Sequence, residues 1–203
     1  MTNENPFALA ITGASGAPYA LRLLEQLIRC DERVDVMISG PGQIVLDMET
    51  EMKLPGRPAG IRRALSEQLG AADGQLRVFG QEEWTAPLAS GSSVPRAMVV
   101  CPCTTGTLAS IAAATSGNLI DRAADVVIKE GRKLVLVPRE TPFSAIHLEN
   151  MLRLARLGVV ILPPNPGFYQ RPASVEDLVD FVVARILDQL GVENDLAPRW
   201  AVD

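Results

Sequence analysis

The stretch LVLVPRETPFSAIHLENML, residues 134–152, decides the fold of this chain. It begins with a short apolar run, the pattern of a strand buried on both faces of a parallel sheet. Arg139 and Glu140 follow the strand directly, and Thr141-Pro142 predicts a helix start with Thr as N-cap. We therefore expect a cation and a carboxylate where open α/β sheets bind ligands. An exposed ion pair of little energetic value is the alternative.

Apolar runs of strand length alternate with helical patterns along most of the chain. Such alternation predicts right-handed crossovers and a parallel sheet covered by helices on both faces. The expected fold class is α/β, a three-layer α/β/α sandwich with a Rossmann-like or flavodoxin-like central sheet. We expect one domain over residues 1–203, in which residues 192–203 form a C-terminal tail. The predicted strands are Phe7–Ile11, Val34–Ile38, Leu76–Phe79, Ala97–Cys101, Leu134–Val137 and Val159–Leu162.

Three segments rich in proline, glycine and serine interrupt this alternation and predict loops. They cover Lys53–Gly60, Thr85–Pro95 and Pro163–Pro172. The last carries Tyr169 in a chain of which only 4% is aromatic. Packing on the protein's own surface and covering a ligand are both open roles for this loop.

Composition excludes several function classes. The formal net charge of −5, without a Lys/Arg cluster, argues against nucleic acid as a partner. No apolar run approaches the roughly 20 residues that a membrane span needs, and the N-terminus lacks the basic segment of a signal peptide. Three cysteines follow no disulfide pattern, so we expect a reducing, cytoplasmic compartment.

Small and polar residues follow three of the predicted strands. Thr12–Gly16 follows the first strand, Ser39-Gly40 the second, and Cys101–Thr107 the fourth. Such turns let backbone N–H groups approach a ligand closely, so together they predict a pocket for a phosphorylated, planar molecule. Neither the dinucleotide G-x-G-x-x-G nor a P-loop is present. The two cysteines of the C-P-C turn are expected to be buried and structural, since no further metal ligand lies nearby.

The titratable residues include no catalytic triad or dyad that could carry out hydrolysis. The only histidine, His147, falls within an apolar helix and is expected to be structural. Without a Ser/His/Asp or Cys/His set, nucleophilic hydrolysis is disfavoured. The remaining candidates are Glu49, Lys129, Arg139, Glu140 and Arg185.

Several long motifs, in this order, resemble the UbiX-type flavin prenyltransferases of the flavin-containing Cys decarboxylase-like superfamily. The resemblance runs from Ile11 to Trp200, and only residues 53–75 show no feature specific to this family. It implies a parallel three-layer fold with FMN at subunit interfaces, in a homododecamer built from trimers. The motifs are ITGASG at 11–16, CPCTTGTLASIA at 101–112, NLIDRAADVVIKE at 118–130, LVLVPRETPFSAIHLENML at 134–152, ILPPNPGFY at 161–169 and SVEDLVDFVVARIL at 174–187.

The resemblance also implies a reaction. Members of this family transfer a dimethylallyl group from dimethylallyl monophosphate to N5 and then C6 of reduced FMN, without a metal ion. A flavin reductase would supply the reduced FMN, and a UbiD-type decarboxylase would receive the prenylated FMN.

Matching the motifs assigns roles to individual residues. Ser15 and Glu49 would relay protons around N5, and Glu140 would protonate the leaving phosphate. Glu49 and Lys129 are candidates to reach in from neighbouring subunits. Because aromatic residues are scarce in this chain, we also expect the Tyr169 loop and Trp200 to close over the substrate. FMN would be held by Gly13, Ala14, Ser15, Ser39, Thr104, Thr105, Gly106, Thr107 and Arg139, and the donor by Lys129, Arg139, Glu140, Tyr169, Arg185 and Trp200.

Two other functions fit an FMN pocket. A cysteine-peptide decarboxylase would need a histidine base close to the flavin and an Asn-Met loop, which PPNPGFY at 163–169 does not supply. A non-catalytic flavin carrier would not need Lys129, Glu140, Tyr169 and Arg185. The sequence supports a dehydrogenase even less, because the second predicted strand ends in Ile38-Ser39 and not in the acidic residue that binds the ribose of NAD.

Overall fold

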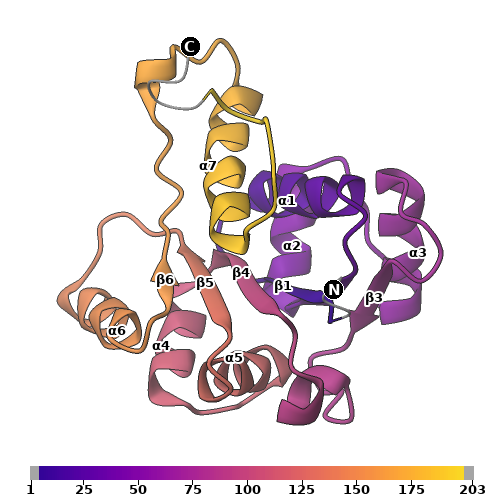
Figure 1. The fold of residues 1–203 in the computed structure, drawn as a ribbon, viewed down its shortest axis with the longest axis vertical. Helices are drawn as coiled ribbons and strands as arrows, with labels where there is room; N and C mark the ends of the chain where they lie inside the picture. The colour runs from indigo at the N-terminus through magenta and orange to yellow at the C-terminus, as the bar shows by residue number, and fades with distance from the viewer. Residues whose placement is uncertain (1–4, 199–203) are drawn as a thin grey trace.

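A six-stranded, all-parallel sheet organises the chain in the order β3-β2-β1-β4-β5-β6. The computed structural model describes residues 5–198, and Figure 1 shows the sheet between two layers of helices. The predicted three-layer α/β/α fold is confirmed. The strands are β1 (Phe7–Ile11), β2 (Val34–Ile38), β3 (Leu76–Phe79), β4 (Ala97–Cys103), β5 (Lys133–Pro138) and β6 (Val160–Ile161).

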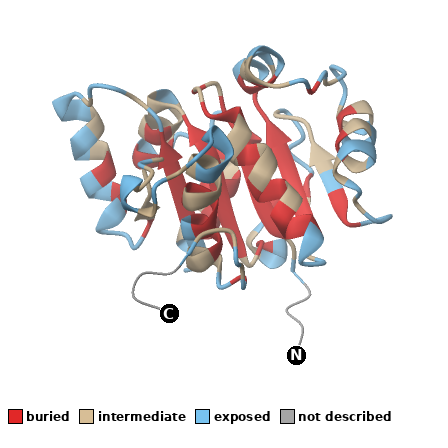
Figure 2. Cartoon of the chain, turned by 90° about the horizontal axis from the view of Figure 1, so that it is seen from above, coloured by how far each residue is buried: buried red, intermediate tan, exposed pale blue. Residues whose placement is uncertain are grey.

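All six predicted strands form, and three of them differ in length. β5 gains one residue at each end, Lys133 and Pro138. β4 continues through Pro102 to Cys103, and β6 is reduced to two residues at the sheet edge. Side chains of the central strands alternate between two cores. Val135 and Val137 face one core, and Leu134 and Leu136 face the other. Burial on both faces explains why these strands are continuous apolar runs (Figure 2).

Each face of the sheet is covered by its own set of helices. The first core includes side chains from α1, α2, α3 and α7, and the second includes side chains from α4, α5 and α6. None of the helices within residues 5–198 has the length and apolar character to cross a bilayer. The helices are α1 (Ala17–Arg29), α2 (Gly40–Glu49), α3 (Pro58–Leu69), α4 (Thr105–Ala113), α5 (Leu119–Lys129), α6 (Ala145–Ala155) and α7 (Val175–Leu190).

The strand order reverses between β1 and β4. From β1 the chain proceeds outward through β2 to β3, then returns to β4 and proceeds the other way through β5 to β6. The helices that follow β1 and β4 therefore cover opposite faces of the sheet and leave a crevice at the carboxyl edge. In doubly wound sheets this switch point is the usual ligand site.

One predicted helix start and the end of one predicted loop are wrong. The helix expected from Pro142 begins at Ala145 instead, because Ser144 and His147 form a reciprocal capping box. The Ser144 Oγ accepts from the His147 amide at 3.3 Å, and His147 Nδ1 accepts from the Ser144 amide at 3.2 Å. α3 begins at Pro58, within the predicted loop, because proline suits the first turn of a helix.

α7 is tied to α1 by an ion pair. Arg22 donates from Nε and Nη2 to both carboxylate oxygens of Asp180, at 2.6 and 3.0 Å. This two-point contact fixes the orientation of α7, which together with the loop after β6 extends beyond the sheet in Figure 1. The segment carrying Tyr169 and Arg185 is thereby anchored at α1.

The first turn of α2 supports a matched test of packing at the carboxyl edge. A Cβ added at Gly42 would lie 2.6 Å from the Ile11 carbonyl oxygen, whereas one at Gly40 would meet nothing within 4 Å. We expect Gly42→Ala to lower the free energy of unfolding by about 1–3 kcal/mol. Gly40→Ala should leave it unchanged or raise it by up to about 1 kcal/mol. Urea unfolding of both variants measures this, and equal effects would contradict the close packing.

Candidate active site

The Thr12 hydroxyl joins the two turns at the switch point. It donates to the Pro102 carbonyl at 2.8 Å and accepts from the Thr104 amide at 2.9 Å. Thr12 is buried, at 2% exposure, and directly follows β1. The turns after β1 and β4 are therefore held side by side as one wall of the site.

Hydroxyl groups cap the two helices that begin at this edge. Ser39 Oγ accepts from the Gly42 amide at 3.0 Å and caps α2, and Thr104 Oγ1 accepts from the Thr107 amide at 3.0 Å and caps α4. Thr104 also donates to Thr107 Oγ1 at 2.9 Å. Because N-caps satisfy only part of a first turn, the amides at the start of α4 still offer donors to an anion.

Glu49, the last residue of α2, reaches the turn after β1. Its Oε2 accepts from the amides of Gly16 and Ala17 at 2.8 and 2.9 Å. Although partial burial opposes it, hydrogen bonds from Ser15 and these two amides, with the charge of Arg139, keep the pKa of Glu49 below its usual value. Glu49 is therefore ionised at neutral pH. The structure brings together the predicted residues Ser15, Glu49 and Arg139.

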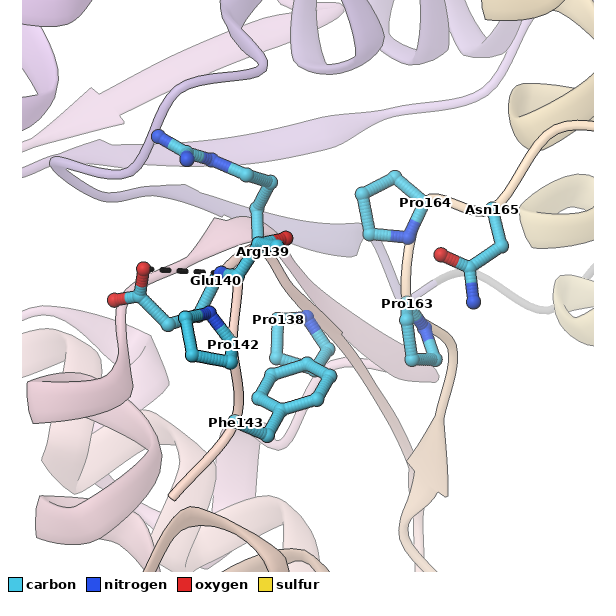
Figure 3. Close-up of a pocket in the computed structure, with 9 residues that line it drawn as sticks. Pro138, Arg139, Glu140, Pro142, Phe143, Pro163, Pro164 and Asn165 are labelled. Carbon is cyan, nitrogen blue, oxygen red and sulfur yellow. Dashed lines mark hydrogen bonds between the residues drawn. The ribbon is translucent and has the colours of Figure 1, made fainter.

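Arg139 and Glu140 lie at the end of β5 and point in different directions (Figure 3). Arg139 extends to the turn after β1, where its Nε donates to the Ser15 carbonyl at 3.2 Å. Glu140 turns away and accepts from the Thr141 amide at 3.1 Å. Arg139 and Glu140 therefore do not pair with each other, so the alternative of an exposed ion pair between them is wrong. They border a cavity of about 260 Å³ lined by Pro138, Arg139, Glu140, Thr141, Pro142, Phe143, Pro163, Pro164 and Asn165.

Arg185 borders a second cavity, of about 370 Å³, between α7 and β6. Pro163 and Asn165 line both cavities, so the two are adjacent. Arg185 forms an ion pair with Asp188 at 2.6 Å. Tyr169 lies on the single turn Phe168–Gln170, with its ring edge-on to Phe181 at 5.9 Å between centroids. Arg185 thus lies beside the Arg139 cavity but outside its lining, and Tyr169 contacts Phe181, which lines the second cavity.

Lys129 lies far from Arg139 within one chain. It ends α5 shortly before β5 begins, whereas Arg139 follows the end of β5. A strand of this length separates its ends by roughly 20 Å. Lys129 forms an ion pair with Glu130, close to Gly91. Trp200, predicted to close over the substrate, lies outside the described residues.

Sequence and structural comparisons agree with this arrangement. Residues 1–187 match the family model described as Flavoprotein. The flavin prenyltransferase UbiX of Pseudomonas aeruginosa is 58% identical over 200 residues, covering 98% of this chain and 96% of the relative. The chain belongs to the UbiX-type flavin prenyltransferase family.

Two solved structures of UbiX-like proteins share the whole fold. A dodecameric FMN-dependent UbiX-like decarboxylase from Escherichia coli O157:H7 superposes with a TM-score of 0.86 at 41% identity, covering 97% of this chain and 100% of the other. AnUbiX (PadA1), solved in complex with FMN and dimethylallyl pyrophosphate, also superposes with a TM-score of 0.86. It is 37% identical, and 98% of each chain is covered.

In this family member Cys101, Cys103 and His147 occupy structural positions, as predicted. Cys101 and Cys103 are buried, free thiols. Burial raises the pKa of Cys101 strongly and that of Cys103 to about 12, so both stay protonated. The His147 ring is held in the capping box of α6 and stacks edge-on to Phe143. This placement disfavours a cysteine-peptide decarboxylase, which would need a histidine base at the flavin.

Three residues of the site were not assigned a role from the sequence. Phe143 and Asn165 line the Arg139 cavity, and Thr12 holds the two turns together. A hydroxyl directly after a strand and before glycine was the available signal for Thr12. Phe143 and Asn165 carried none, because their position depends on how two irregular segments meet.

The charge of Glu49 should make stability depend on pH. Its folded pKa lies below the ordinary 4.5, so its stabilising effect is complete above pH 4.5 and is lost as the pH falls through the folded value. Glu49→Gln keeps an oxygen acceptor but removes the charge at the start of α1. We expect it to lower the free energy of unfolding by about 0.3–1 kcal/mol at neutral pH. Denaturation of both proteins across pH measures the difference, which should shrink in acid; a constant difference would contradict a role for the charge.

Proposed function

We propose that this protein is a flavin prenyltransferase that joins a dimethylallyl group from dimethylallyl monophosphate to N5 and C6 of reduced FMN. The prenyl C–O bond breaks, inorganic phosphate leaves, and N5 bonds to the prenyl group and loses its proton. The prenyl double bond then takes up a proton, and the resulting cationic carbon bonds to C6, which loses its own proton. The observation that carries the proposal is the gathering of Ser15, Glu49 and Arg139, with Glu140 beside them, at the switch point of a chain in this family.

The carboxyl edge fits FMN. Reduced FMN supplies the nucleophilic atoms N5 and C6. Gly13–Ser15, Ser39 and Thr104–Thr107 provide close backbone approach and amide donors, from the ends of β1, β2 and β4. Arg139 adds an exposed cation at the end of β5, beside the Ser15 carbonyl. These groups suit the polar edge of a flavin and its phosphate.

Basic side chains stabilise the leaving phosphate in place of a metal ion. Arg139 lines the cavity, and Arg185 borders the adjoining one. Lys129 would complete this cluster from a neighbouring subunit, and the Tyr169 hydroxyl would add a hydrogen bond. Fixed cations aimed at developing negative charge commonly give the largest contribution in such sites.

Proton transfers fall to Glu140, Ser15 and Glu49. Glu140 lies at the cavity next to Arg139, where it protonates the departing phosphate. Glu49 is ionised and accepts the Ser15 hydroxyl, so the pair can relay protons around N5. Tyr169 and the tail with Trp200 close over the donor, excluding water from the allylic cation.

Anaerobic incubation with reduced FMN and dimethylallyl monophosphate tests the function. Mass analysis of the extracted flavin should show the gain of one isoprene unit by wild type. Glu140→Gln removes the acid and should slow product formation by about 10²–10⁴-fold, while FMN and donor still bind. Unmodified flavin with wild type would overturn the function, and wild-type turnover in Glu140→Gln would overturn the acid role.

The site is completed by a homo-oligomer, which we expect to be a dodecamer like the E. coli relative. Large apolar side chains are exposed on the two helices that flank the carboxyl edge. On α2, Met48 is 78% exposed, and on α6, Ile146 is 68% exposed. Contacts between copies would cover such surfaces. The other exposed apolar residues of these regions are Ile44, Leu148, Leu152 and Leu157.

The protein is placed between two other enzymes in a reducing cytoplasm. A flavin reductase supplies reduced FMN, and a UbiD-type decarboxylase takes up the prenylated product. Support for a reducing compartment comes from the free thiols Cys30, Cys101 and Cys103.

Mixed oligomers test whether Lys129 and Arg139 meet across subunits. Lys129→Ala and Arg139→Ala should each lose most activity as homogeneous oligomers. Co-expressed, they should recover activity, because some sites then combine an intact Lys129 with an intact Arg139 from different chains. Product formation by purified mixed oligomers measures this, with the exposed neighbour Arg132→Ala as the control that keeps activity. No recovery would place both residues in one chain.

A further inference from the structure

The start of α1 has no cap from its own segment. Gly16 is the N-cap residue, with φ of 126°, and no side chain of the turn bonds to the helix amides. Instead, the Glu49 carboxylate accepts from the Gly16 and Ala17 amides at 2.8 and 2.9 Å. In doubly wound folds a ligand phosphate usually occupies this place at the first helix. Here a side-chain anion already fills it.

The position of Glu49 is unfavourable for its own helix. It is the last residue of α2, where the negative end of the helix dipole disfavours an acid, and no basic residue lies in that turn. Its favourable contacts are all with the turn after β1 and with Arg139. Glu49 therefore stabilises the start of α1 and the turn after β1, and it slightly destabilises the end of α2.

We infer that Glu49 is an internal anion that occupies the phosphate position of α1 and turns ligand phosphates away from it. Its charge and its place on the two amides both exclude a second anion there. The uncharged ring of FMN then faces the turn after β1, where Ser15 lies. The FMN phosphate is directed to the other amide donors of the edge, those at the start of α4. Glu49 is thus a positioning residue in addition to its proposed role in proton transfer.

The inference rests on the proposed function only in taking FMN as the ligand, and its test does not require prenyl transfer. Inorganic phosphate is titrated calorimetrically into flavin-free, full-length protein. Glu49→Ala vacates both amides and should bind one more phosphate per chain than wild type. Glu51→Ala removes an equal charge from an exposed position two residues away and should bind as wild type does.

A crystal structure of Glu49→Ala with phosphate should place the additional ion on the Gly16 and Ala17 amides. If this variant does not fold, Glu49→Gln provides a second test. It keeps the acceptor but loses the charge, so the protein's affinity for phosphate should rise without an additional site. Wild-type stoichiometry in Glu49→Ala, an additional ion elsewhere, or unchanged affinity in Glu49→Gln would each overturn the inference.

Discussion

The buried hydroxyl of Thr12 bonds to backbone groups at the switch point of the sheet, and the rest of the site depends on these bonds. Parallel strands that diverge at a switch point leave backbone groups without strand partners, and buried groups of this kind must be satisfied. The Thr12 hydroxyl bonds to two of them, the Pro102 carbonyl, which also accepts from the Thr12 amide, and the Thr104 amide. The turns after β1 and β4 can then lie together although their helices cover opposite faces. The positions of Ser15 and of the first turn of α4 depend on this junction.

Acidic and basic side chains alternate at the carboxyl edge. Anionic Glu49 lies against α1, Arg139 lies beside it, and Glu140 points away on the far side. Arg139 is therefore held by the Ser15 carbonyl, with the charge of Glu49 nearby, and it remains exposed to a ligand. Bringing in a reduced, phosphorylated flavin and a phosphorylated donor adds negative charge, which explains the need for further cations around this edge.

Sequence reasoning succeeded where local patterns carry the information. Buried strands such as Val34–Ile38 show as continuous apolar runs, and Ser39 and Thr104 are recognisable as residues at strand ends. The start of α6 was misplaced because Thr141-Pro142 and Ser144 both fit an N-cap pattern, and only the side-chain bond from Ser144 decides between them. The contact of Glu49 with α1 joins residues more than thirty apart, which no local pattern encodes. The separation of Lys129 from Arg139 likewise follows from the direction of β5, and motif spacing does not reveal it.

The burial of the two β4 thiols has a consequence for selectivity among nucleophiles. An allylic phosphate is an alkylating agent, and a cysteine thiolate would compete with the flavin for it. Only the thiolate reacts readily, and burial keeps Cys101 and Cys103 in the protonated form directly beneath the turn that begins α4. The same protonation guards them against peroxide formed when reduced flavin meets oxygen. Cys101 and Cys103 can therefore pack tightly at this edge without being alkylated by the donor or oxidised by peroxide.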